Sequence, residues 1–228
     1  MRSHVAKTVR TCFAALRQLR SVRRSVPRPV LQSLVSSLVL SWLDYGNGSL
    51  VGIPLCQLER LQSVINSSAR MVFSSWRFDH ITPFLRQLHW LKVPERIDYK
   101  LALLVYKCLQ GVAPSYLADD LCRSADFEAW HRLRSASSPS LVVRRTRLST
   151  YGDRAFPVAA SRVWNSLPHH VTSAQSLPVF CSRLKTHLFS RSFRWLYCCA
   201  CEVTLVITDT LIAVFTYLLT YFKAQISK

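Results

Sequence analysis

Arginines in this chain gather in two short segments, and each guanidinium can donate two parallel hydrogen bonds to a phosphate group. Aromatic side chains lie among or near the second segment, where they could stack on nucleotide bases. Arginine density indicates affinity for phosphate rather than preference for a base sequence. The candidate phosphate-binding residues are Arg20, Arg23, Arg24, Arg144, Arg145, Arg147 and Arg154, and the candidate stacking residues are Tyr151, Phe156 and Trp164.

A purely structural interpretation of the second segment stands beside this one. Its three aromatic residues could anchor a hydrophobic core, and Asp153 could form a local salt bridge with Arg154. Gly152 would let the backbone turn tightly or approach a partner closely, because it has no Cβ. The sequence therefore leaves two roles open for these aromatic residues.

The net charge is strongly positive and unevenly distributed. The sequence contains 30 lysines and arginines and 12 aspartates and glutamates, which gives a formal net charge of +18 at pH 7. No acidic residue precedes Arg28, and Asp153 is the only one between Ala129 and Trp195. Such charge concentrates phosphate-rich partners near the protein, so RNA or DNA is the first expected partner and an anionic membrane surface the second. The alternative is that the charge only keeps the chain soluble.

Cysteine and histidine residues do not form a recognisable metal site. Five of the eight cysteines stand singly and are interpreted as buried free thiols, whereas three cluster between Cys198 and Cys201 without a second pair at zinc-finger spacing. His80 and His89 lack neighbouring ligands and are interpreted as capping or core-edge residues. We therefore expect no metal and no cofactor. Without the apolar run of a secretory signal at the N-terminus, a reducing compartment is expected.

Hydrophobic periodicity and proline positions predict a mainly α-helical fold. An amphipathic basic helix over residues 3–24 ends before Pro27 and Pro29. A second helix covers residues 30–43, and a third begins after Pro54. Together they predict a small helical bundle.

The following region is predicted to be helical and rich in loops. Thr82 and Pro83 begin a short helix, and Pro94 begins a long one that ends near Gly111. Arg96, Lys100 and Lys107 are expected to present cations on one face of the long helix. Two short strands are expected at 141–143 and 147–151, and two further helices at 155–167 and 177–189.

An ordered series of motifs runs through this helical chain. FDHITP begins at Phe78 and LHWLKVPERIDYKL at Leu88. They are followed by Arg145-Thr146-Arg147, Tyr151-Gly152-Asp153-Arg154-Ala155-Phe156, Trp164-Asn165-Ser166-Leu167-Pro168 and Leu184-Lys185-Thr186-His187-Leu188-Phe189. This order resembles the region after the polymerase core in LINE-type (non-LTR) retrotransposon reverse transcriptases of the jockey-like and chicken-repeat-like groups. The resemblance covers residues 1–193.

The resemblance implies a domain organisation. Residues 1–75 would correspond to the polymerase thumb, which grips the template duplex. Residues 76–123 would be a helical region, 124–140 a Ser-rich linker and 141–193 an Arg-rich C-terminal region. Residues 194–228 form a hydrophobic tail outside the resemblance. In the parent enzyme this part would hold template RNA and target DNA, in the nucleus or the cytoplasm.

The catalytic groups of a polymerase are not found in this sequence. Two-metal catalysis needs carboxylates placed around both ions. Tyr116-Leu117-Ala118-Asp119-Asp120 resembles the Tyr-x-Asp-Asp turn of reverse transcriptases, but two residues instead of one separate the aromatic residue from the aspartates. We interpret Asp119 and Asp120 as helix-surface acids. The expected function is non-specific nucleic-acid binding by a non-catalytic fragment, without a small-molecule substrate.

The C-terminal tail suggests an alternative function. Val203 to Phe222 is almost wholly apolar apart from Asp209 and four threonines, and about 20 apolar residues can span a bilayer core. The segment could anchor a small membrane protein with a basic cytosolic domain, or cover the helical bundle. It could also be translated flanking sequence in a retroelement remnant without a function.

Overall fold

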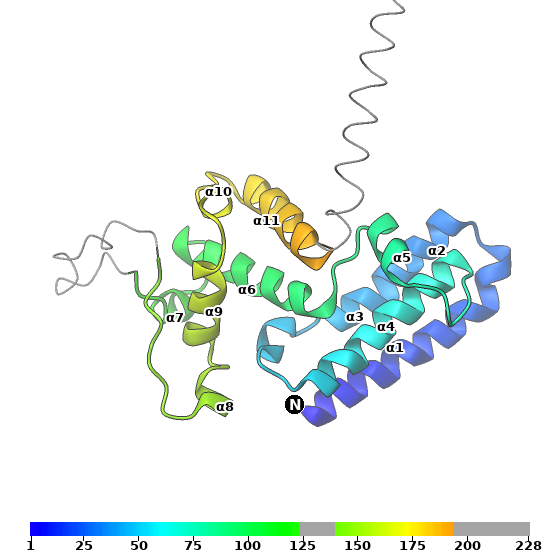
Figure 1. Cartoon of the computed structure of the whole chain (residues 1–228), viewed down its shortest axis with the longest axis horizontal. Coiled ribbons are helices and arrows are strands. Elements are labelled where there is room, and N and C mark those ends of the chain that lie inside the picture. Colours follow the sequence, from blue (N-terminus) through cyan, green and yellow to red (C-terminus); the bar gives the residue numbers. More distant parts are fainter. Residues whose placement is uncertain (124–139, 194–228) are drawn as a thin grey trace, which may run out of the picture. The chain divides into compact units, whose positions relative to one another are not determined.

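The computed structural model describes residues 1–123 and 140–193 (Figure 1). The chain divides into two compact units, residues 1–189 and 190–228. Of the second unit, only residues 190–193 lie in the described part, and residues 190–192 belong to the last turns of a helix. The first unit is mainly α-helical, which confirms the predicted fold class. Residues 124–139 of the expected linker 124–140 and the tail segment Val203 to Phe222 lie outside the described residues.

The N-terminal bundle is built on two long helices, α1 (Arg2–Val22) and α4 (Leu55–Phe73), which pack against each other (Figure 1). A short 3₁₀ turn, η1 (Arg23–Ser25), continues α1. The buried residues of both helices recur at spacings of three, four and seven, so each presents one apolar stripe to the core. They are Val5, Cys12, Leu16 and Leu19 in α1, and Leu61, Val64, Ile65, Ser68, Ala69 and Val72 among those in α4.

A continuous helical stretch lies between these two helices in the sequence. It consists of α2 (Arg28–Val35), a π-helical turn η2 (Ser36–Leu40) and α3 (Ser41–Asp44). A helix ending near residue 43 was predicted, but the π-turn was not. Serines are dense here, and the hydroxyls of Ser37 and Ser41 donate to backbone carbonyls one turn earlier. Such bonds compete with the regular helical ladder and bend it. The 3₁₀ turn η3 (Asn47–Leu50) then leads towards α4.

Helix α6 (Val93–Leu109) connects the bundle to the C-terminal helices. It begins with proline in its first turn, as predicted, and Gly111 with φ of 69° follows its end. It contacts α4 and η3 on the bundle side and α9 (Phe156–Asn165) on the other. The short helices α5 (Thr82–Gln87) and α7 (Ser115–Ala118) flank it in the sequence.

The C-terminal core forms around one face of α6. The Tyr106 ring stacks on Phe180 of α11 (Leu177–Ser192) with centroids 4.2 Å apart, and its hydroxyl donates to the carbonyl of Ala174 at 3.1 Å. Ala102, Val105, Ala160 of α9 and Val171 of α10 (His169–Thr172) belong to the same cluster. Burial of these aromatic and aliphatic side chains supplies the main driving force for docking α9, α10 and α11 onto α6.

The two predicted strands are wrong. Residues 149–152 form the single-turn helix α8 (Ser149–Gly152), and the described residues contain one isolated bridge, Arg123 to Leu141, rather than a sheet. The reason is that a side chain takes the place of a partner strand. Asn165 accepts a hydrogen bond from the Leu141 N–H at 2.9 Å and donates one to the Leu141 carbonyl at 2.8 Å.

The predicted state of the single cysteines is confirmed in part. Cys12 and Cys108 are buried free thiols, and burial raises the pKa of Cys12 to about 11. Cys122 and Cys181 are free but only partly buried, and Cys56 is exposed in the first turn of α4, contrary to prediction, because it lies off the buried stripe of that helix. In the part of the chain that the structure describes, no helix is both long enough and apolar enough to cross a membrane.

Asn165 should contribute to stability through the Leu141 backbone. Asn165→Ala leaves the N–H and the carbonyl of buried Leu141 without these partners and should lower the free energy of unfolding by roughly 1–3 kcal/mol. Ser166→Ala is the matched control, since the Ser166 hydroxyl bonds only to the Val163 carbonyl within the same helix end. Urea unfolding of both variants measures the difference, and equal losses would contradict the bridging role.

Candidate nucleic-acid interface

The basic loop, residues 144–147, precedes α8 and holds three exposed arginines around one anchored threonine. The Thr146 hydroxyl donates to the Asp153 carboxylate at 2.7 Å. Thr146 also packs on Gly152, where an added Cβ would lie 2.6 Å from the Thr146 Cβ. Glycine at 152 therefore permits a contact that fixes the loop against α8.

Asp153 is occupied by contacts within the fold. Arg162 of α9 pairs with its carboxylate at 2.9 Å, and the bonds from Arg162 and Thr146 lower the Asp153 pKa. The suggested salt bridge between Asp153 and Arg154 is therefore wrong, because Arg162 from the next helix provides the cation. The sole acid of this segment is thus bonded to Thr146 and Arg162, and to neither Arg145 nor Arg147.

The arginines of the basic loop differ in their surroundings. The Arg144 guanidinium donates to the Cys122 sulfur at 3.6 Å. Arg145 and Arg147 are exposed, and within the described residues neither side chain has a hydrogen-bonding or ion-pairing partner. These two guanidinium groups are consequently available to an external anion.

Arg154, predicted as a phosphate contact, has a structural position instead. Its Nε donates to the Val51 carbonyl at 2.9 Å, and its guanidinium contacts the Met1 sulfur. Its aliphatic part covers Gly52, whose added Cβ would lie 3.0 Å from the Arg154 Cγ. Arg154 therefore ties the segment after α8 to the loop between η3 and α4.

The three candidate stacking residues differ in how deeply they are buried. Trp164 is 4% exposed and its ring lies 6.0 Å from that of Phe180, so it is a core residue. Phe156 is partly buried against the same core. Tyr151 is 76% exposed, one residue before Gly152. Only Tyr151 of the three presents its ring broadly to solvent.

The N-terminal arginine group lies at the end of α1. Arg24 is exposed in η1, whereas Arg20 and Arg23 line a cavity of about 290 Å³ together with other arginines. Two of these, Arg70 and Arg77, were not identified from the sequence, because they stand on α4 and in the loop after it. Only the packing of α1 beside α4 brings them to the first group.

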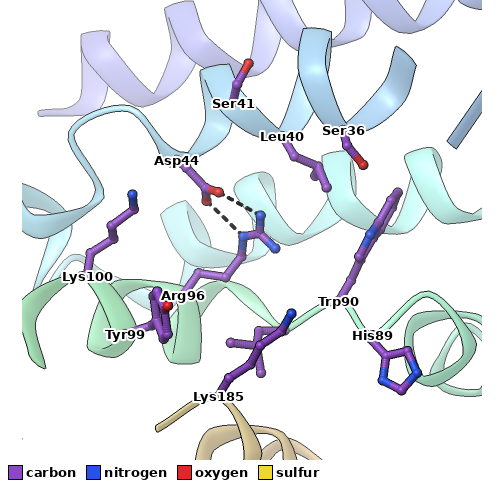
Figure 2. Close-up of a pocket in the computed structure, with 11 residues that line it drawn as sticks. Ser36, Leu40, Ser41, Asp44, His89, Trp90, Arg96, Tyr99, Lys100 and Lys185 are labelled. Carbon is purple, nitrogen blue, oxygen red and sulfur yellow. Dashed lines mark hydrogen bonds and ion pairs between the residues drawn. The ribbon is translucent and has the colours of Figure 1, made fainter. Parts of the chain in front are cut away.

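A second cavity, of about 490 Å³, surrounds an internal ion pair (Figure 2). Arg96 was predicted as an exposed cation, but its guanidinium binds the Asp44 carboxylate through Nε at 2.9 Å and Nη2 at 2.8 Å. This bidentate pair fixes the start of α6 to the end of α3. Lys100 and Lys185 also line the cavity.

Two further residue pairs from the sequence can now be placed. His89 has φ of 53° and follows α5, where the Trp90 N–H donates to the Leu85 carbonyl, which confirms a capping role for His89. His80 is exposed. Asp119 and Asp120 follow the single turn of α7 directly, with no strand on either side, and this agrees with their interpretation as surface acids.

No family model, curated protein or solved structure matches this chain. Its function must therefore be argued from the arrangement of its own side chains.

Adding one methyl group at position 152 should disturb the contact between Thr146 and Gly152. Gly152→Ala should displace the basic loop and lower the free energy of unfolding by about 1–3 kcal/mol, as overpacking does elsewhere. Gly48→Ala is the control, since its added Cβ meets Leu104 and Leu101 at ordinary distances of 3.8 and 3.9 Å. Chemical unfolding of both variants compares them, and a Gly152→Ala protein as stable as the control would contradict the close contact.

Proposed function

We propose that this chain binds RNA and DNA through their phosphates, with little sequence preference and without catalysis. The resemblance to the thumb and post-polymerase region of a LINE-type reverse transcriptase suggests the origin of this activity. The observation that carries the proposal is the basic loop, where Arg145 and Arg147 are exposed while Asp153, the one acid between Ala129 and Trp195, is paired with Arg162.

The anchoring of the basic loop favours binding over simple solubility. Thr146 is held by both Asp153 and Gly152, so the backbone between the two free arginines is already ordered. A preorganised site loses less conformational entropy when it binds its ligand. The exposed ring of Tyr151 supplies a stacking surface beside these cations, which suits unpaired bases.

The absence of a base-reading arrangement among the loop residues supports low specificity. Arginines exposed on a loop neutralise phosphates and release counterions, and this contribution does not depend on base sequence. The membrane-anchored alternative depends on Val203 to Phe222, which lies outside the described residues. No described feature favours that alternative.

The basic loop should account for part of the salt dependence of binding. For Arg145→Ala combined with Arg147→Ala, the slope of log affinity against log salt should fall by up to about 1.4–1.8, since each lost phosphate contact contributes roughly 0.7–0.9. Fluorescence anisotropy with labelled single-stranded and duplex oligonucleotides over a salt series measures this slope.

A control variant with the same loss of charge distinguishes binding at the basic loop from binding spread over the whole basic surface. Arg60→Ala combined with Arg183→Ala removes the same charge from α4 and α11 and should change the slope much less. Equal reductions in the two double variants would show that the loop has no special role. If the wild-type protein binds neither oligonucleotide, the proposed function is wrong.

A further inference from the structure

The cavity of about 290 Å³, called the arginine cavity from here on, lies where the C-terminal ends of α1 and α4 meet. No acidic residue lines it. Its cations come from three places in the sequence: α1 with η1, α4, and the loop after α4. They are Arg17, Arg20, Arg23, Arg70 and Arg77.

Two buried polar atoms of the residues lining this cavity lack a partner. In the described structure, Nε of Arg70 and Oγ of Ser75 are inaccessible to solvent and make no hydrogen bond. Buried polar groups are nearly always satisfied, so each such atom calls for an explanation. Arg70 Nη2 donates to the Asp79 carbonyl at 3.3 Å, which leaves Nε as its buried unpartnered donor. An anion with several acceptor oxygens inside the arginine cavity would satisfy the Arg70 N–H and the Ser75 hydroxyl once both side chains turn towards it.

The alternative is that these arginines only neutralise the helix ends. A helix C-terminus carries roughly half a negative charge, so two ends supply about one negative charge against five arginines. Carbonyls at the end of α4 are moreover already bonded, since Ser74 N–H donates to Met71 and Ser75 N–H to Arg70. Asp79, the nearest acid in the following loop, accepts a bond from the Trp76 N–H. A large positive excess therefore remains.

The surroundings of the arginine cavity favour a nucleotide strand over a free anion. Phe13, Leu16 and Met71 also line the cavity, next to the cations. In the loop that follows Ser75, Trp76 is 80% exposed and Phe78 is 85% exposed. Large aromatic residues that remain in water beside a phosphate-binding cavity are suited to stacking on unpaired bases.

Arg77 connects the two features. It lines the cavity, and its guanidinium carbon also lies 5.2 Å from the centre of the Phe78 ring. The cations and the exposed aromatic rings therefore form one continuous surface. Single-stranded nucleic acid offers both complementary groups, a phosphate every nucleotide and a base free to stack.

We propose that the arginine cavity binds a backbone phosphate of single-stranded RNA or DNA, and that a neighbouring base stacks on Trp76 or Phe78. This site is separate from the basic loop, and it deepens the proposed function by naming a strand type and a second contact region. It rests on the proposed function only for the identity of the ligand.

The first experiment tests the cavity with phosphate alone. Inorganic phosphate should raise the melting temperature of the wild-type protein above that in sodium chloride of equal ionic strength. Arg20→Ala combined with Arg77→Ala should lose this shift, and the control pair Arg60→Ala with Arg183→Ala should keep it. A shift that is absent in the wild type, or that persists in the cavity variant, overturns the anion site.

The second experiment tests the nucleic-acid strand. The cavity variant should bind a short oligothymidylate about tenfold more weakly, with a salt slope lower by up to about 1.4. Trp76→Ala combined with Phe78→Ala should also weaken oligothymidylate binding, by about tenfold, but with an unchanged slope, because stacking involves no counterion release. Binding of a duplex of the same length should change little in the aromatic variant.

The outcomes separate this inference from the proposed function. Oligothymidylate binding that is lost in the Arg145 and Arg147 variant but retained in the cavity variant overturns the inference alone. A phosphate shift without oligonucleotide binding, or displacement of phosphate only by vesicles containing anionic lipid, overturns its assignment to a nucleic-acid strand. Equal effects of the aromatic variant on single-stranded and duplex DNA overturn the stacking contact.

Discussion

The described fold depends on α6 being buried on two sides at once. Its contacts with α4 and η3 hold the N-terminal bundle, while Tyr106 forms the centre of the C-terminal core through its stack on Phe180 and its bond to Ala174. The charged side chains of α6 are Glu95, Arg96, Asp98, Lys100 and Lys107, and of these only Lys100 is exposed. The ion pair between Arg96 and Asp44 then sets how the first turn of α6 meets α3. Arg96 therefore has a structural role.

Three acidic residues in the described part of the chain form structural contacts. Asp44 binds Arg96, Asp153 binds Arg162 and Thr146, and Asp79 accepts a bond from the Trp76 backbone. Each of these contacts orders a loop or a helix junction, and Asp153 also pairs with Arg162, whose side chain is half exposed. Arg145 and Arg147 of the basic loop are bonded to none of these carboxylates. In a chain with a net charge of +18, this division explains how a folded protein can hold arginines ready for phosphate.

Sequence reasoning succeeded where local chemistry decides the structure. Prolines in the first turn and regular apolar spacing predicted the helices that begin after Pro54 and around Pro94. It failed where a distant group intervenes, since Asn165 replaced the partner of an expected strand. For Trp164 it left a core and a stacking role open, and the contact with Phe180 decides for the core. Arg70 and Arg77 carried no local signal, since their neighbours in space come from α1. Clustered arginines can be read from the sequence, but the residues that join them around the cavity depend on helix packing.

The π-turn η2 determines how far α3 is rotated about the helix axis relative to α2. A regular helix advances about 100° per residue, and a π-turn accommodates roughly one extra residue without breaking the helix. Removing a single residue between Ser36 and Leu40 would therefore restore regular winding and leave α3 at nearly the same rotation relative to α2, whereas adding a residue would rotate everything that follows by about 100°. After such an insertion Asp44 would leave the side of the helix that meets Arg96, and Leu43 would turn out of the core. The π-turn thus makes this helical stretch tolerant of a one-residue deletion and intolerant of a one-residue insertion.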